Sequence, residues 1–165
     1  MVFEQKLDNA KDLTDIFELV KKTVYDIKKG RRSGIMLGLA DLGAGKYQWI
    51  GGYHVLSSNS IIMNSRPLDY IKQNNPSLLK PYEYVILLHE YLHTLGIINE
   101  QECRDVTHEI CLELFGFNHL VTNMAKDMTQ FLPYIQTAEY GWEPPQDLNV
   151  YYIRGFDRSS TSYII

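Results

Sequence analysis

The chain has 165 residues and a formal net charge of -4, and 45% of its residues are hydrophobic. This length corresponds to one domain, so we expect residues 1–165 to form a single domain whose core needs no disulfide or metal to fold. The composition excludes a disordered chain, and the mild acidity argues against a nucleic-acid partner. No apolar run is long enough to cross a membrane, and the charged start lacks the apolar stretch of a signal peptide. We therefore expect a cytoplasmic protein without a membrane partner.

A helix is the first element that the sequence predicts. Apolar residues recur at helical spacing over residues 9–29. Asn9 or Asp12 is suited to cap the start of this helix, and Gly30 is suited to end it.

Short strands follow this helix in the predicted order. The apolar run over residues 34–40 is too short for a typical helix, and the aromatic and β-branched segment over residues 46–56 favours a hairpin or meander. One more strand spans residues 61–64 and ends at Arg66-Pro67. The polar residues 68–81 then read as a connector that contains one helical turn.

Helices dominate the second half of the chain. Pro81 occupies the first-turn position that proline prefers, and the helix that it opens runs to Gly96. Further helices are predicted over residues 99–115 and 119–131, and residues 150–154 favour a strand. Because the strands are grouped between the helices, the expected fold class is α+β.

The sequence HEYLH at residues 89–93 is the motif that carries chemistry. His89 and His93 are four residues apart on a predicted helix, so their side chains project from one face about one turn apart. This spacing gives two nitrogen ligands to one tetrahedral zinc ion. Glu90 points about 100° away around the helix axis, so it is free to hold and deprotonate a water molecule on the ion, whose pKa falls toward about 7.

With this motif the chain resembles the zincin metallopeptidases, which share HExxH on an active-site helix, and its small size is similar to that of the compact minigluzincins. The order of N-terminal helix, small twisted sheet, motif helix and further helix is also similar. The resemblance implies zinc as the cofactor, His89 and His93 as ligands, and Glu90 as general base and acid. It also implies that the last strand, near SIIMN at residues 60–64, borders the cleft and binds substrate as an added strand.

A catalytic zinc site has three protein ligands and one open position, and the motif provides only two ligands. In metzincins the third is a histidine six residues after the second, but Asn99 occupies that position here. In gluzincins it is a glutamate on the following helix, and Glu102 is preferred here because it lies in the first turn, nearest the motif helix. The glutamates that this resemblance makes candidates are Glu100, Glu102, Glu109 and Glu113.

Other interpretations of the third ligand stay open. Asn99 and Glu102 have the spacing of a capping box, which satisfies free amides at a helix start and needs no metal. His119 is the strongest histidine alternative, and Cys103 is a further candidate. Cys103 and Cys111 are separated by about 12 Å along their predicted helix, too far for a disulfide.

The sequence therefore predicts a zinc-dependent metallopeptidase that hydrolyses peptide bonds of a peptide or protein substrate. The alternative is a non-proteolytic or latent zinc-binding module on the same scaffold, because the short chain leaves little room for a deep cleft. Residues 134–165 form a C-terminal extension without an obvious core role. We expect this extension to cover the cleft or to mediate a dimer.

Overall fold

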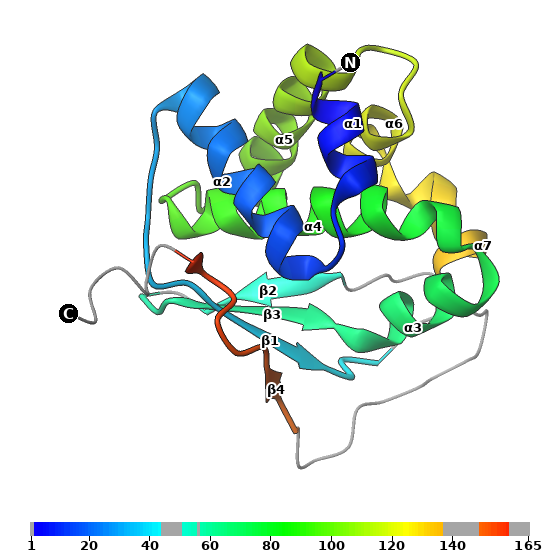
Figure 1. Cartoon of the computed structure of the whole chain (residues 1–165), viewed down its shortest axis with the longest axis horizontal. Helices are drawn as coiled ribbons and strands as arrows, with labels where there is room; N and C mark the ends of the chain where they lie inside the picture. The colour runs from blue at the N-terminus through cyan, green and yellow to red at the C-terminus, as the bar shows by residue number, and fades with distance from the viewer. Residues whose placement is uncertain (1, 44–50, 56, 137–148, 159–165) are drawn as a thin grey trace.

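The computed structural model describes residues 2–43, 51–55, 57–136 and 149–158 (Figure 1). It is an α+β fold in which N-terminal helices precede a four-stranded mixed sheet and several helices follow, so the predicted class is confirmed. Among the described residues, no helix is long and apolar enough to cross a membrane. The elements in chain order are α1 (Val2–Asn9), α2 (Leu13–Lys28), β1 (Met36–Ala40), β2 (Gly52–His54), β3 (Ser60–Asn64), α3 (Ser65–Asn74), η1 (Pro76–Leu78), α4 (Leu79–Thr94), α5 (Glu100–Phe115), α6 (Leu120–Lys126), η2 (Met128–Phe131), α7 (Leu132–Ile135) and β4 (Tyr151–Tyr152).

The sheet has the strand order β2-β3-β1-β4. β1 and β3 pair in parallel, whereas β2 and β4 pair antiparallel to β3 and β1. This order corrects one expectation, since SIIMN forms the interior strand β3 and β2 lies at the edge. The side chains that join the sheet to the helical core alternate along the two central strands, as a pleated strand requires; they are Leu37, Leu39, Ile61 and Met63.

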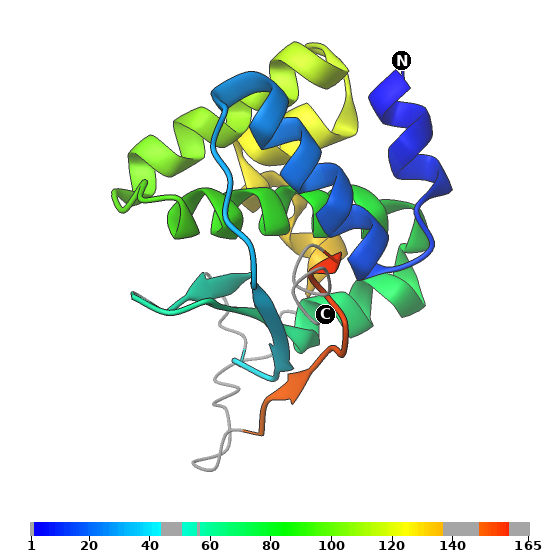
Figure 2. The same cartoon turned by 60° about the vertical axis from the view of Figure 1, so that its left-hand side comes forward.

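The helices cover one face of this sheet, and α4 is the helix that lies closest to it (Figures 1 and 2). Most of α4 is buried, because it contacts β2 and β3 on one side and α2, α5 and α6 on the others. Its sequence is therefore apolar on nearly every face, as a helix in the middle of a core must be. This placement puts the HEYLH motif between the sheet and the helices α2, α5 and α6.

The helix predicted over residues 9–29 is two helices, α1 and α2. Asp12 accepts a hydrogen bond from the Asp15 backbone N–H at 2.8 Å, so it caps α2 and separates it from α1. Lys29, with φ 59°, adopts the left-handed conformation that ends α2. The sequence had predicted Gly30 for this position.

The predicted polar connector over residues 68–81 is also helical. Asn64 caps α3 by accepting from the Arg66 backbone N–H, and Pro67 then lies in the first turn, where proline starts a helix instead of ending a strand. The motif helix begins at Leu79, two residues before Pro81. Of the predicted strand over residues 46–56, only Gly52–His54 forms a strand, and residues 46–50 and 56 lie outside the described part.

The end of the described chain packs into the core. β4 pairs with β1, and the Phe156 ring, 2% exposed, stacks on Phe17 with 4.3 Å between the ring centroids. Asp157 is equally buried, where it accepts a hydrogen bond from Lys21 at 2.6 Å and from the Ile35 backbone N–H at 3.1 Å. This part of the predicted extension therefore ties α2 to the sheet. Residues 137–148 and 159–165 lie outside the described structure.

Candidate metal centre

His89 and His93 project from α4 toward the start of α5. Their Nε2 atoms lie 3.1 Å apart, and their rings meet edge to face with 4.7 Å between centroids. A zinc–nitrogen bond of about 2.0–2.1 Å gives an edge of about 3.3 Å in a tetrahedral site. The two nitrogens are therefore close to the separation that one zinc ion requires.

A backbone carbonyl fixes the orientation of His93. Gly96, with φ +106°, turns the chain back after α4, and this turn brings the Ile97 carbonyl oxygen to 2.6 Å from His93 Nδ1. A carbonyl can only accept, so Nδ1 carries a proton; in the neutral imidazole this leaves the lone pair on Nε2. Metal-binding histidines are commonly held in this way, because the hydrogen bond on the outer nitrogen fixes the tautomer and the ring.

The Glu100 carboxylate faces both imidazoles. Its Oε1 lies 2.8 Å from His93 Nε2, and its Oε2 lies 3.2 Å from His89 Nε2. Asn99 positions this residue, since its side chain caps α5 by accepting from the Glu102 backbone N–H at 2.9 Å. The structure thus brings two imidazole nitrogens and one carboxylate to a common point.

Cys103 lies one turn further along α5. The ligand atoms of His89, His93 and Cys103 all lie within 4.8 Å of one another, so these residues form a group that could hold a metal ion. The Cys103 thiol donates to the His89 carbonyl oxygen at 3.2 Å, and burial raises its pKa to about 12. Both cysteines are buried and free, as the predicted separation requires.

Glu90 lies beside this group in a dry environment. Its side chain is 5% exposed, and its Oε2 atom has no hydrogen-bond partner among the described residues. Burial, with a smaller contribution from the negative charge of Glu100, raises the Glu90 pKa to about 8. Burial also lowers the pKa of His89, with the His93 charge adding to the effect, and so favours the neutral imidazole that binds a metal.

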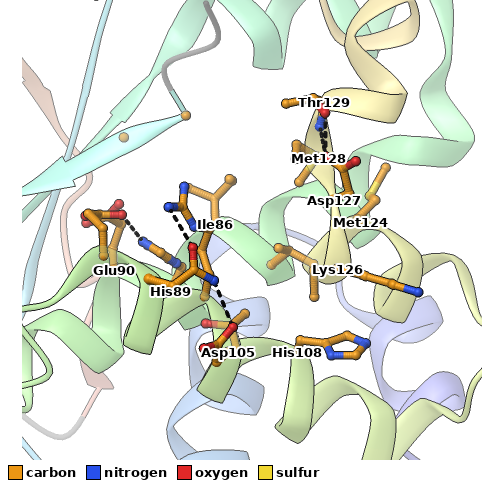
Figure 3. A pocket seen from close by; sticks show the side chains of 18 residues that line it. Ile86, His89, Glu90, Asp105, His108, Met124, Lys126, Asp127, Met128 and Thr129 are labelled. Carbon is orange, nitrogen blue, oxygen red and sulfur yellow. Dashed lines mark hydrogen bonds and ion pairs between the residues drawn. The ribbon is translucent and has the colours of Figure 1, made fainter.

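A cavity of 710 Å³ is lined by His89, Glu90 and Glu100 of this site. In Figure 3, His89 and Glu90 lie at one side of this cavity, and Met124, Lys126 and Met128 lie at the opposite side. Gly51 and Gly52, at the start of the edge strand β2, also line it. The candidate metal group is therefore open to a molecule the size of a short peptide.

The structure shows which of the predicted third ligands lies near the two histidines. Glu100 lies against the histidines, whereas the Glu102 side chain is exposed and makes no hydrogen bond or ion pair with them in the described part of the chain. Glu109 is 3.6 Å from Lys28, and His119 caps α6 by accepting from the Val121 N–H. Glu102 was preferred because it lies in the first turn, nearest the motif helix, but Glu100 lies in that turn as well. The path of the preceding loop decides between them, and this path leaves no pattern in the sequence.

Comparisons with protein-family models, with curated proteins and with solved structures give no match for this chain. The candidate site is therefore defined by its geometry alone. What that geometry shows is a possible metal-binding group in an α+β fold.

Proposed function

We propose that the protein is a zinc-dependent hydrolase that cleaves peptide bonds. The observation that supports this most strongly is the convergence of the His89 and His93 Nε2 atoms, 3.1 Å apart, at a cavity that His89 and the buried Glu90 line. Two nitrogen donors and a carboxyl with a raised pKa in a cavity are the components of a hydrolytic zinc site. Nothing in the comparisons names the reaction, so the proposal rests on this chemistry.

In this proposal His89, His93 and Glu100 hold the ion, and Glu100 takes the place that the sequence assigned to Glu102. A zinc ion supplies Lewis acidity toward a carbonyl oxygen and lowers the pKa of a bound water molecule. Glu90 accepts a proton at its unpartnered Oε2 and passes it to the leaving amine. Burial raises the Glu90 pKa to about 8 in the metal-free chain, and a cation bound beside it would lower that value toward neutral pH, where the group can take and release a proton.

The edge strand supports a peptide as the substrate. Among the described residues, β2 pairs with β3 on one side only, and its Gly52 lines the same cavity as His89 and Glu90. An extended peptide can add to such an edge through its backbone, which places one of its carbonyls near the histidines. We therefore assign to β2 the role that the sequence had suggested for SIIMN.

The first prediction tests Glu90. Purified protein should contain about one zinc per chain by elemental analysis, and it should cleave a degenerate fluorogenic peptide library. Glu90→Gln should retain the zinc and lose hydrolysis by a factor of about 100 or more, because proton transfer contributes on this scale. A protein without stoichiometric zinc, or a Glu90→Gln variant of undiminished activity, would falsify the proposal.

A closed, non-catalytic zinc site is the second candidate, and the position of Cys103 favours it. Together with Glu100, the group of His89, His93 and Cys103 offers four donors, the number that a structural zinc site uses. Cys103→Ala distinguishes the candidates, because it weakens zinc binding only if the thiol is a ligand. Cys111→Ala, which removes a buried thiol outside this group, is the matched control.

A further inference from the structure

We propose that Arg104 forms a carboxylate-binding subsite of this cavity, which selects peptides that carry a negative charge close to the scissile bond. The proposal rests on the proposed peptidase function and names its substrate class. The geometry that carries it is an arginine that has no carboxylate partner among the described residues and lines the cavity one helical turn from Glu100.

The wall that α5 presents to the cavity gives Arg104 its position. Glu100, Arg104 and His108 lie at intervals of four residues, so they share one face of the helix, and all three line the cavity. Four residues of helix advance about 6 Å. The backbone of Arg104 therefore lies about 6 Å along the helix from that of Glu100, whose carboxylate contacts both imidazoles.

The guanidinium group of Arg104 has N–H donors that make no hydrogen bond to the described residues. Its contact among the described residues is a 3.4 Å hydrogen bond to the Gln101 side-chain oxygen, and it forms no ion pair there. A guanidinium carries five N–H donors in a planar fork that matches a carboxylate. Arg104 is exposed at the cavity lining, so most of this capacity has no acceptor among the described residues.

Three of the acidic residues that line the cavity, all except Glu90, are engaged elsewhere. Asp105 accepts from the Gln101 side-chain amide at 2.9 Å, and Asp127 accepts from the Thr129 backbone N–H at 3.1 Å at the start of η2. Glu100 contacts the two imidazoles. None of these carboxylates is paired with Arg104 in the described part of the chain, so an incoming carboxylate would not have to displace one of them.

Further positive charge lies at the far side of the cavity. Figure 3 shows Lys126 there, opposite His89 and Glu90. Lys126 forms no ion pair within the described ranges. Arg104 and Lys126 therefore provide cationic groups on two walls, and a ligand that extends from the metal group meets Arg104 first.

The spacing determines where the negative charge must lie in the substrate. An extended chain advances about 3.3–3.6 Å per residue, so a distance of about 6 Å corresponds to one or two residues from the scissile bond. The carboxylate can come from a peptide C-terminus or from an aspartate or glutamate side chain. Both offer two oxygens to the same fork of donors.

The experiment uses four degenerate peptide pools of matched composition, with a free or an amidated C-terminus and with or without acidic residues. Binding is measured by an NMR titration of the zinc-loaded full chain carrying Glu90→Gln, followed at the Arg104 side-chain N–H signal and at backbone amides, so turnover is not needed. We expect pools with a carboxylate to bind about fivefold to tenfold more tightly than the amidated neutral pool. Arg104→Gln should remove this preference, and Arg154→Gln, at an exposed arginine outside the cavity, should retain it.

The outcomes separate this inference from the proposed function. A preference that follows the free C-terminus identifies the α-carboxylate as the ligand, and one that follows acidic residues identifies a side chain. Equal binding of all four pools, no binding of any pool, or a preference that survives Arg104→Gln overturns the subsite. Loss of zinc or of hydrolysis in the unsubstituted protein would overturn the peptidase function, while the binding preference would still show whether Arg104 recognises carboxylates.

Discussion

Glu100 and Glu102 lie two positions apart on α5, and this difference decides which carboxylate reaches the histidines. Each residue of an α-helix rotates by about 100° around the axis, so the two side chains point about 200° apart. Glu100 faces His89 and His93 at 3.2 and 2.8 Å, whereas Glu102 contributes its backbone N–H to the Asn99 cap. The first turn of α5 therefore combines a candidate ligand with a cap.

Zinc affinity should distinguish these two glutamates. Glu100→Ala should weaken zinc binding by at least about tenfold, because loss of even an outer-shell partner commonly has an effect of this size. Glu102→Ala should leave the affinity nearly unchanged, since the backbone N–H that Asn99 caps is retained. Competition with a chromogenic chelator measures both values. A larger effect of Glu102→Ala would restore the sequence-based preference for that residue.

The sequence predicts the HEYLH motif, but it does not predict which residues of other elements surround the two histidines. The four-residue interval between His89 and His93 specifies a shared helix face, so their convergence could be predicted from spacing. Glu100 reaches them because Gly96, with φ +106°, turns the loop back toward α4. That conformation depends on the three-dimensional path of the loop, and no local pattern distinguishes the two glutamates. Arg104 was not predicted for the same reason.

At the scale of elements, α4 combines deep burial with two acidic side chains. Glu83, near its start, is 8% exposed, and burial raises its pKa to about 7 despite the nearby charges of Lys72 and Lys80. A carboxyl with a raised pKa binds its proton more tightly in the folded protein than in the unfolded chain. Its contribution to stability is thus complete below about pH 4.5 and is lost as the pH rises through about 7.

Removing this charge should change the pH dependence of unfolding. Glu83→Gln should be more stable than the unsubstituted protein at pH 8, on the order of 1–3 kcal/mol, and the advantage should shrink toward pH 5. Urea unfolding at both pH values measures the difference. Glu90 titrates in both proteins, so its effect cancels. Glu113→Gln, at an exposed position on α5, is the control, and an equal gain there would contradict the role of burial.

Element boundaries were predicted best where a cap has a strong chemical signature. Asp12 and Asn99 cap α2 and α5 as their positions suggested. Helix α3 was overlooked because its residues are mostly polar and Pro67 was interpreted as the end of a strand. Proline is equally compatible with a first helical turn, and the deciding interaction, the Asn64 cap, becomes visible only in three dimensions.

At the scale of the whole molecule, the fold is held together by segments from its two ends. Phe156 stacks on Phe17 of α2, and Asp157 bonds to Lys21 and to the Ile35 N–H. The α+β class could be predicted from the order of elements. The pairing of β4 with β1 could not, because contacts between residues so distant in sequence depend on the packing of everything between them.

The stacking of Phe156 on Phe17 provides a test of how much the C-terminal segment stabilises the fold. Phe156→Ala should destabilise the protein by about 3 kcal/mol or more, the usual cost of removing a buried phenylalanine ring. Tyr151→Ala removes an aromatic ring from the same segment at a position that is 70% exposed, so its effect should stay below about 1 kcal/mol. Thermal or urea unfolding measures both. Similar losses in the two variants would indicate that the segment contributes no specific core packing.

The late position of β4 also matters while the protein is being made. On the ribosome β1 is complete long before Tyr151 and Tyr152 are synthesised, so one edge of the nascent sheet keeps its hydrogen-bonding groups exposed until that segment has been made. Exposed strand edges recruit other chains, which makes this interval a hazard for aggregation. Nascent chains stalled before residue 150 should therefore bind chaperones more strongly than the released protein.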